Sequence, residues 1–139
     1  MDVNQPKQEM RWVSALSELT GSKEAIGQVV AKLEKELGET QPDLICVFVS
    51  SHHGASYPLV SKELNGAFPS ALLFGCSAGA VLARGEEVEE RPGISVMAAI
   101  LPGVELTPFH LLADQFPDDE AGLDLFNMEA RSGVRYESE

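Results

Sequence analysis

The stretch Leu44-Ile-Cys-Val-Phe-Val49, followed by Ser50-Ser-His-His-Gly54, decides the fold class. Six consecutive apolar residues, rich in β-branched and aromatic side chains, are too short for a buried helix and predict a central strand covered on both faces. In an α/β sheet the ligand crevice lies outside the carboxyl ends of the strands. The polar residues after Val49 therefore lie where a ligand would bind.

Two helices flank this strand in the sequence. One is expected over residues 22–37, because apolar residues recur there every three or four positions, with Ser22 as its N-cap and Gly38 as a left-handed C-cap. A second is expected over residues 57–64, ended by residues 65–66.

The remaining apolar segments predict further strands, which make the sheet mixed. They are an opening strand over 10–16, a short buried strand over 71–74, an antiparallel pair over 81–88 and 93–101 joined by an acidic turn, and a half-exposed strand over 104–112. The expected fold is α/β, with helices packed on a mixed β-sheet as a two-layer or three-layer sandwich.

The small-residue stretch Gly75-Cys-Ser-Ala-Gly79 is predicted to be a loop directly after a strand, and it matches the G-x-S-x-G string of a hydrolase nucleophile elbow. An elbow requires a following helix, then an acid, then a histidine. Gly85 and Pro92 interrupt the next segment, and no Asp lies between Ser77 and His110. The alternative is that backbone N–H groups and the Ser77 hydroxyl bind a carboxylate or a similar small anion.

Three histidines occur, of which His52 and His53 are adjacent. Neighbouring side chains on extended backbone point in opposite directions, and carboxylates do not cluster near them, so no metal site is expected. A thiol nucleophile at Cys76 activated by either histidine would lack a third orienting group. We expect no catalytic residue and no cofactor. The expected ligand-binding residues are Ser50, His52, His53, Cys76 and Ser77.

Composition narrows the class of protein and of partner. Ten basic and 22 acidic side chains give a net charge of −12, which repels nucleic acid and anionic membranes. Two cysteines form no disulfide framework, and no apolar stretch is long enough to span a bilayer. A cytoplasmic location is expected, the alternative being an organelle lumen such as the plastid after removal of a transit peptide.

Three segments in order resemble one known family. They are Trp12-Val-Ser-Ala-Leu-Ser17, Pro42-Asp-Leu-Ile-Cys-Val-Phe-Val-Ser-Ser-His-His53, and the stretch from Gly75-Cys-Ser-Ala-Gly79 through Arg91-Pro-Gly93 to Met97. Together they resemble the N-terminal domain of the FIST (F-box and intracellular signal transduction) family over residues 10–112. The resemblance implies an intracellular sensory module, found in bacteria and in eukaryotic F-box proteins, that is proposed to bind small ligands such as amino acids. It transfers no catalytic residues.

Residues 1–9 are polar and have no periodicity, which predicts a disordered N-terminus, and residues 113–139 are predicted to be an acidic, incomplete C-terminal segment. The resemblance implies a FIST N-terminal-like domain over 10–112. Family members usually continue into a second, C-terminal FIST domain. Such a domain or a signalling effector is therefore an expected partner, and an exposed apolar surface or a homodimer would be expected without it. One alternative function is a protein-interaction adaptor domain of an F-box-type protein, which would bind an effector through its acidic surface or through its C-terminal segment with Leu123–Met128. The other is a hydrolase or thiol enzyme that uses Ser77 or Cys76.

Overall fold

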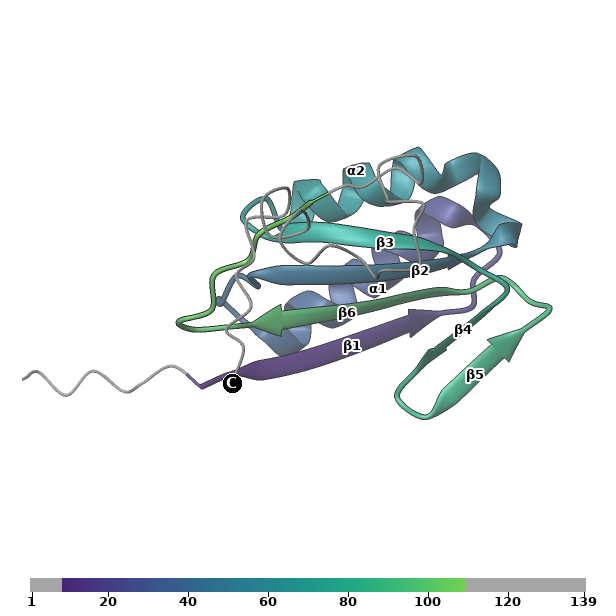
Figure 1. The fold of residues 1–139 in the computed structure, drawn as a ribbon. Helices are drawn as coiled ribbons and strands as arrows, with labels where there is room; N and C mark the ends of the chain where they lie inside the picture. Colours follow the sequence, from purple (N-terminus) through teal and green to yellow (C-terminus); the bar gives the residue numbers. More distant parts are fainter. Residues whose placement is uncertain (1–8, 110–139) are drawn as a thin grey trace, which may run out of the picture. The chain divides into compact units, whose positions relative to one another are not determined.

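A computed structural model describes residues 9–109 (Figure 1). In chain order these residues form β1 (Arg11–Ser17), α1 (Ser22–Leu37), β2 (Leu44–Ser50), a 3₁₀ turn η1 (Ser51–Ser56), α2 (Tyr57–Ala67), β3 (Leu72–Ala78), β4 (Ala80–Ala83), β5 (Glu86–Glu89) and β6 (Ile94–Ile100).

Four strands form one mixed sheet in the order β1-β6-β2-β3. The pair β2–β3 is parallel, whereas β6 runs antiparallel to both β1 and β2. The parallel register places Ser50 opposite Ala78, so β2 and β3 end at the same edge of the sheet. The predicted α/β fold with a mixed sheet is confirmed.

Both helices cover the same face of this sheet (Figure 1). The buried residues of α1 recur at the spacing of one helical face: Ala25, Ile26, Val29, Leu33 and Leu37. They share one core with Val60 and Leu64 of α2 and with alternate residues of the strands, such as Val13, Ile45 and Val96. Gly38, with φ 65°, ends α1 as predicted. The N-cap residue is Gly21, so the prediction that Ser22 caps this helix is wrong.

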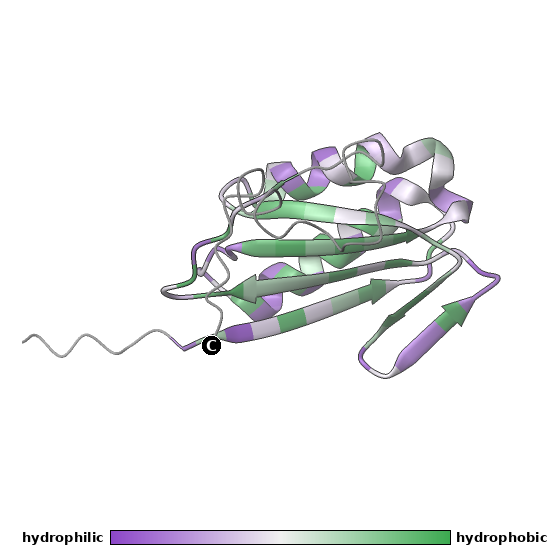
Figure 2. Ribbon diagram, in the orientation of Figure 1, coloured by the Kyte–Doolittle hydropathy of each residue, from purple (hydrophilic) through white to green (hydrophobic). Residues whose placement is uncertain are grey.

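The opposite face of the sheet carries a two-stranded hairpin formed by β4 and β5. Its turn, Arg84-Gly85, has positive φ at both residues, the geometry that suits a two-residue hairpin. Val81, Ala83 and Val88 pack there with Leu16 of β1 in a second small core. The sheet strands are mostly apolar, and β5 is mostly hydrophilic (Figure 2).

Among residues 9–109, this hairpin leaves part of the second sheet face uncovered. Trp12, Phe48, Phe74 and Met97 alternate with the core residues of their strands, and between 38% and 54% of each is exposed. The prediction that the strand after residue 43 is covered on both faces therefore holds only in part, because Phe48 is 38% exposed.

Several predicted boundaries differ from the structure. Residues 75–78 continue β3 instead of forming a loop, and α2 runs through residues 65–66 to Ala67. The predicted strand over 81–88 is itself a hairpin, and β6 pairs with β1 and β2 instead of with it. Residues 104–109 form no strand.

The chain divides into two compact units, Met1–Gly103 and Val104–Glu139. The predicted disordered N-terminus, apart from Glu9, and the predicted acidic segment over 113–139 lie outside the described residues, so those boundaries stay predictions. No helix within residues 9–109 is long and apolar enough to cross a membrane.

Candidate ligand-binding cavity

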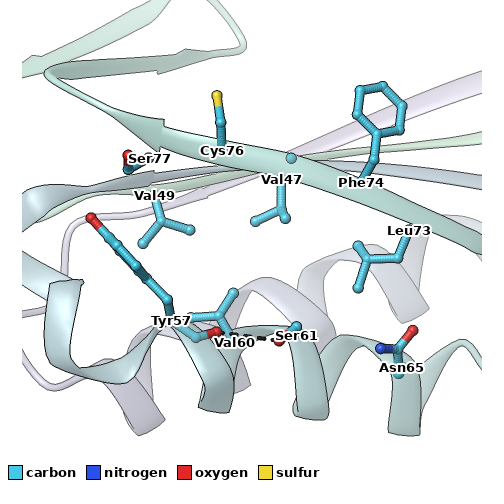
Figure 3. A pocket seen from close by; sticks show the side chains of 11 residues that line it. Val47, Val49, Tyr57, Val60, Ser61, Asn65, Leu73, Phe74, Cys76 and Ser77 are labelled. Atoms are coloured by element: carbon cyan, nitrogen blue, oxygen red, sulfur yellow. Dashed lines mark hydrogen bonds between the residues drawn. The ribbon is translucent and has the colours of Figure 1, made fainter. Parts of the chain in front are cut away.

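A cavity of about 500 Å³ lies between α2 and the edge strand β3 (Figure 3). Leu73 of β3 points toward the helices (Figure 3), and because side chains alternate along a strand, positions 75 and 77 lie on the same side. Two of these three positions carry little or no side chain, so β3 cannot fill the space beneath α2. The same small residues that suggested a loop in the sequence therefore leave a hollow along a strand.

The cavity has an apolar floor and an uncharged polar rim. The floor is formed by Val47, Val49, Val60 and Leu73. The rim carries Tyr57, Ser61 and Asn65, which recur every fourth residue along one stripe of α2, and Ser77 across from them. No charged side chain contributes to the lining. This is the composition of a small-molecule site, apolar with a few polar groups that set orientation.

Gly75 brings β3 unusually close to β2. A Cβ atom at this position would lie 1.9 Å from the carbonyl oxygen of Val47 and 2.7 Å from a methyl of the same residue. Only glycine fits such an approach without a shift of the backbone. The tight β2–β3 contact and the hollow beside it thus have the same cause.

Of the five residues predicted to bind a ligand, Ser77 lies in the cavity with its side chain. Cys76 belongs to the lining, but its thiol points away from α2 to the other side of the sheet, as does the ring of Phe74 (Figure 3). The thiol of Cys76 is free and exposed.

Ser50 holds the end of β2 in place. Its residue is 1% exposed, its Oγ accepts a hydrogen bond from Gly93 N at 2.9 Å, and its own N–H donates to Gly93 O at 2.9 Å. Gly93 directly precedes β6, so these two hydrogen bonds link the end of β2 to the start of β6. Ser50 does not line the cavity.

The two adjacent histidines lie in different environments. His52 is exposed, whereas His53 is 1% exposed, with its Nδ1 2.9 Å from the Ser22 Oγ of α1. Its Nε2 is buried and has no hydrogen-bond partner among the described residues. Burial, and secondly the charge of His52, lower the pKa of His53 below its ordinary value. The protonated ring would place two donors in the core with one acceptor, so the neutral ring is favoured.

This arrangement bears on the enzymatic alternatives. The Gly75-Cys-Ser-Ala-Gly79 string belongs to a strand up to Ala78, so it does not form the strand-to-helix turn of a nucleophile elbow. Neither His52 nor His53 lines the cavity with Ser77. Within residues 9–109, no group of three or more His, Cys, Asp or Glu residues could hold a metal ion.

The sequence-based prediction of ligand-binding residues covers only the predicted strand ends and does not include the three rim residues of α2, Tyr57, Ser61 and Asn65. A signal for them exists: an uncharged polar stripe on an otherwise amphipathic helix, followed by a strand with Gly and Ser at alternate positions. Neither pattern is informative alone, because the pairing of α2 with β3 is a tertiary feature.

Comparison with known proteins gives one match. Residues 43–127 of the 139-residue chain match the FIST N domain, a range that begins at β2 and includes the whole cavity lining. Neither the curated proteins nor the solved structures contain a match. The matched range covers more than half of the sequence, and the chain therefore belongs to the FIST family of sensory domains in signal transduction.

Proposed function

We propose that this protein is an intracellular sensory module that binds a small uncharged ligand in the cavity between α2 and β3, and that it is not an enzyme. The carrying observation is the cavity itself, with its apolar floor and its rim of Tyr57, Ser61, Asn65 and Ser77. Membership of a sensory family supports the same function. Two free cysteines, Cys46 and Cys76, suit a reducing compartment such as the cytoplasm.

The lining also bears on the ligand class. An amino acid or a small anion, the classes expected from the sequence, would bring a carboxylate or an ammonium group into a site whose lining has no countercharge. Hydroxyl and amide groups on the rim suit a ligand that carries carbonyl, hydroxyl or amide groups on an apolar body.

The test is a thermal-shift screen of the full chain against neutral metabolites, with amino acids and small organic acids as comparison sets. A ligand at a hundred times its dissociation constant adds about 2.7 kcal/mol to the free energy of unfolding. That corresponds to a rise in Tm of roughly 10 °C or more for a domain of this size.

The matched variants are Ser77→Leu, which places a larger apolar side chain in the cavity lining, and Ser70→Leu, which adds the same side chain at an exposed residue outside the lining. Ligand binding should be lost in the first variant and retained in the second. A ligand whose shift survives Ser77→Leu binds elsewhere and refutes the assigned site.

A further inference from the structure

Within the part of the chain that the structure describes, the outer edge of β3 is an unprotected sheet edge. Among the described residues β3 pairs only with β2, so its outward N–H and C=O groups have no strand partner. Its sequence, Leu72-Leu-Phe-Gly-Cys-Ser-Ala78, contains no charged residue and no proline. Edge strands normally carry such residues because they prevent pairing with another chain. By contrast, β5 in the small sheet carries three glutamates.

The sequence of β3 suits antiparallel pairing with the β3 strand of a second copy, centred on Gly75. If two β3 strands pair antiparallel with Gly75 opposite Gly75 of the partner subunit, each Leu73 faces the partner's Ser77 on the helix side of the sheet. On the other side each Phe74 faces the partner's Cys76. Each large side chain thus meets a small one, and sulfur lies beside an aromatic ring, which is a favourable contact.

The helix layer permits this arrangement. Two helices cover four strands of the sheet. Strands are spaced about 4.8 Å apart and packed helices about 8–10 Å apart, so one helix covers two strands. An eight-stranded sheet made of two copies would carry four helices at the same spacing. The α2 stripe that faces the edge, Tyr57, Ser61 and Asn65, is uncharged and brings no like charges together.

We propose that two copies of this chain associate through β3, paired antiparallel about Gly75, to form a continuous eight-stranded sheet with two-fold symmetry. Such an interface is isologous, so the same edge serves both copies and no edge of β3 remains for a third. Each subunit contributes its Leu73 beside the partner's Ser77, and thereby narrows the open side of the partner's cavity. The dimer proposal is independent of the proposed ligand. Its tests measure the mass of the protein and need no ligand.

The first measurement is sedimentation equilibrium of the full chain over a range of concentrations. The expected species has twice the monomer mass of 15.0 kDa. Phe74→Glu should shift the protein to monomer, because it places an unpaired charge at the pairing edge. Phe74 is 54% exposed, so this substitution should leave the fold intact, as checked by circular dichroism.

The register is tested with two double variants. In Phe74→Glu/Cys76→Lys, each glutamate faces the partner's lysine, and the dimer should return. In Phe74→Glu/Cys76→Glu, glutamates face one another, and the protein should remain monomeric at all concentrations. If both double variants are dimeric, or both are monomeric, the proposed register is wrong.

A covalent test detects weak association. Directly opposed residues of an antiparallel pair have Cα atoms about 4.5–5.5 Å apart, which suits a disulfide. In the variant Phe74→Cys, the new thiol should therefore form a disulfide with the partner's Cys76 when diamide oxidises both thiols. The mass of the protein should double, and a reductant should reverse the change. Ser70→Cys, outside β3, is the control and should not cross-link. A wild-type protein that is monomeric at every concentration, with no cross-link in Phe74→Cys, overturns the proposal and leaves the β3 edge to another occupant.

Discussion

At the scale of single residues, His53 links stability to pH. Its pKa is lowered in the folded protein, so the unfolded chain takes up a proton near pH 6.5 while the folded state does not. The free energy of unfolding should therefore be highest above pH 6.5 and should fall as the pH is lowered below it. Urea unfolding of the wild type at about pH 7.5, 6.5 and 5.5 measures this slope.

Two substitutions isolate the group responsible. His53→Gln removes the buried imidazole, and the stability of this variant should fall less between about pH 7.5 and 5.5 than that of the wild type. His52→Gln changes the exposed neighbour and should keep most of the wild-type slope. Equal slopes in the wild type and in His53→Gln would show that other groups cause the pH dependence.

Also at the residue scale, glycines at two positions should respond oppositely to alanine. Gly75→Ala places a methyl group against the Val47 carbonyl and should destabilise the protein by about 1–3 kcal/mol. Gly27→Ala, in the middle of α1 where nothing lies within 4 Å of the new Cβ, should stabilise it by about 0.5–1 kcal/mol. Chemical denaturation of both variants gives the comparison, and a neutral Gly75→Ala would mean that β3 can move away from β2.

At the scale of elements, the β4–β5 hairpin should open independently of the main core. Its small core contains Val88, which is 1% exposed, whereas Leu82 on the same hairpin is 70% exposed. Val88→Ala should lower the opening free energy of the hairpin amides by about 2 kcal/mol. Leu82→Ala should change it little.

Hydrogen exchange resolves this prediction by element. In Val88→Ala the amides of β4 and β5 should exchange faster, while those of β2 and β6 keep their protection. Equal acceleration in all strands would show that the hairpin and the main sheet unfold as one unit.

Elements also show why sequence patterns predicted some boundaries and missed others. The limits of α1 and β2 follow from local signals: a helical period that ends at a glycine, and a short apolar run. Residues 75–78 have small side chains and low strand propensity, yet they are extended because they pair with residues 47–50 of β2. Such pairing is non-local, so the loop prediction failed there.

The hairpin turn was misplaced for a similar reason. The acidic residues 89–92 suggested the turn, but the chain reverses at Arg84-Gly85, where an arginine adopts positive φ at 55°. That conformation is uncommon for a residue with a side chain, and it is stabilised here by Val81 and Val88 packing on Leu16. At the cavity, the local Gly75–Gly79 stretch predicts Ser77 as a ligand-binding residue. The rim residues of α2 cannot be predicted in this way, because they reach the cavity only through the packing of α2 against β3.

At the scale of the whole molecule, the net charge of −12 should weaken the folded state through self-repulsion. Among residues 9–109, the exposed ion pairs Arg84–Glu36 and Arg91–Glu18 offset little of it. Raising NaCl from about 0.01 M to 0.15 M shortens the Debye length from about 30 Å to 8 Å and should raise the Tm. Calorimetry measures the change, and a Tm that falls over this range would show that attractive pairs dominate.

The strand order β1-β6-β2-β3 also constrains how the protein folds while it is being synthesised on the ribosome. β6, whose last residue is Ile100, lies between β1 and β2, so among the described strands of the main sheet β1 has no strand to pair with until β6 has been made. Translation at about 5–20 residues per second leaves β1 waiting for several seconds. During that interval the nascent chain exposes the apolar residues of β1, including Trp12 and Val13. A chaperone that binds short apolar segments would have access to β1 during this interval and would be released when β6 pairs with it.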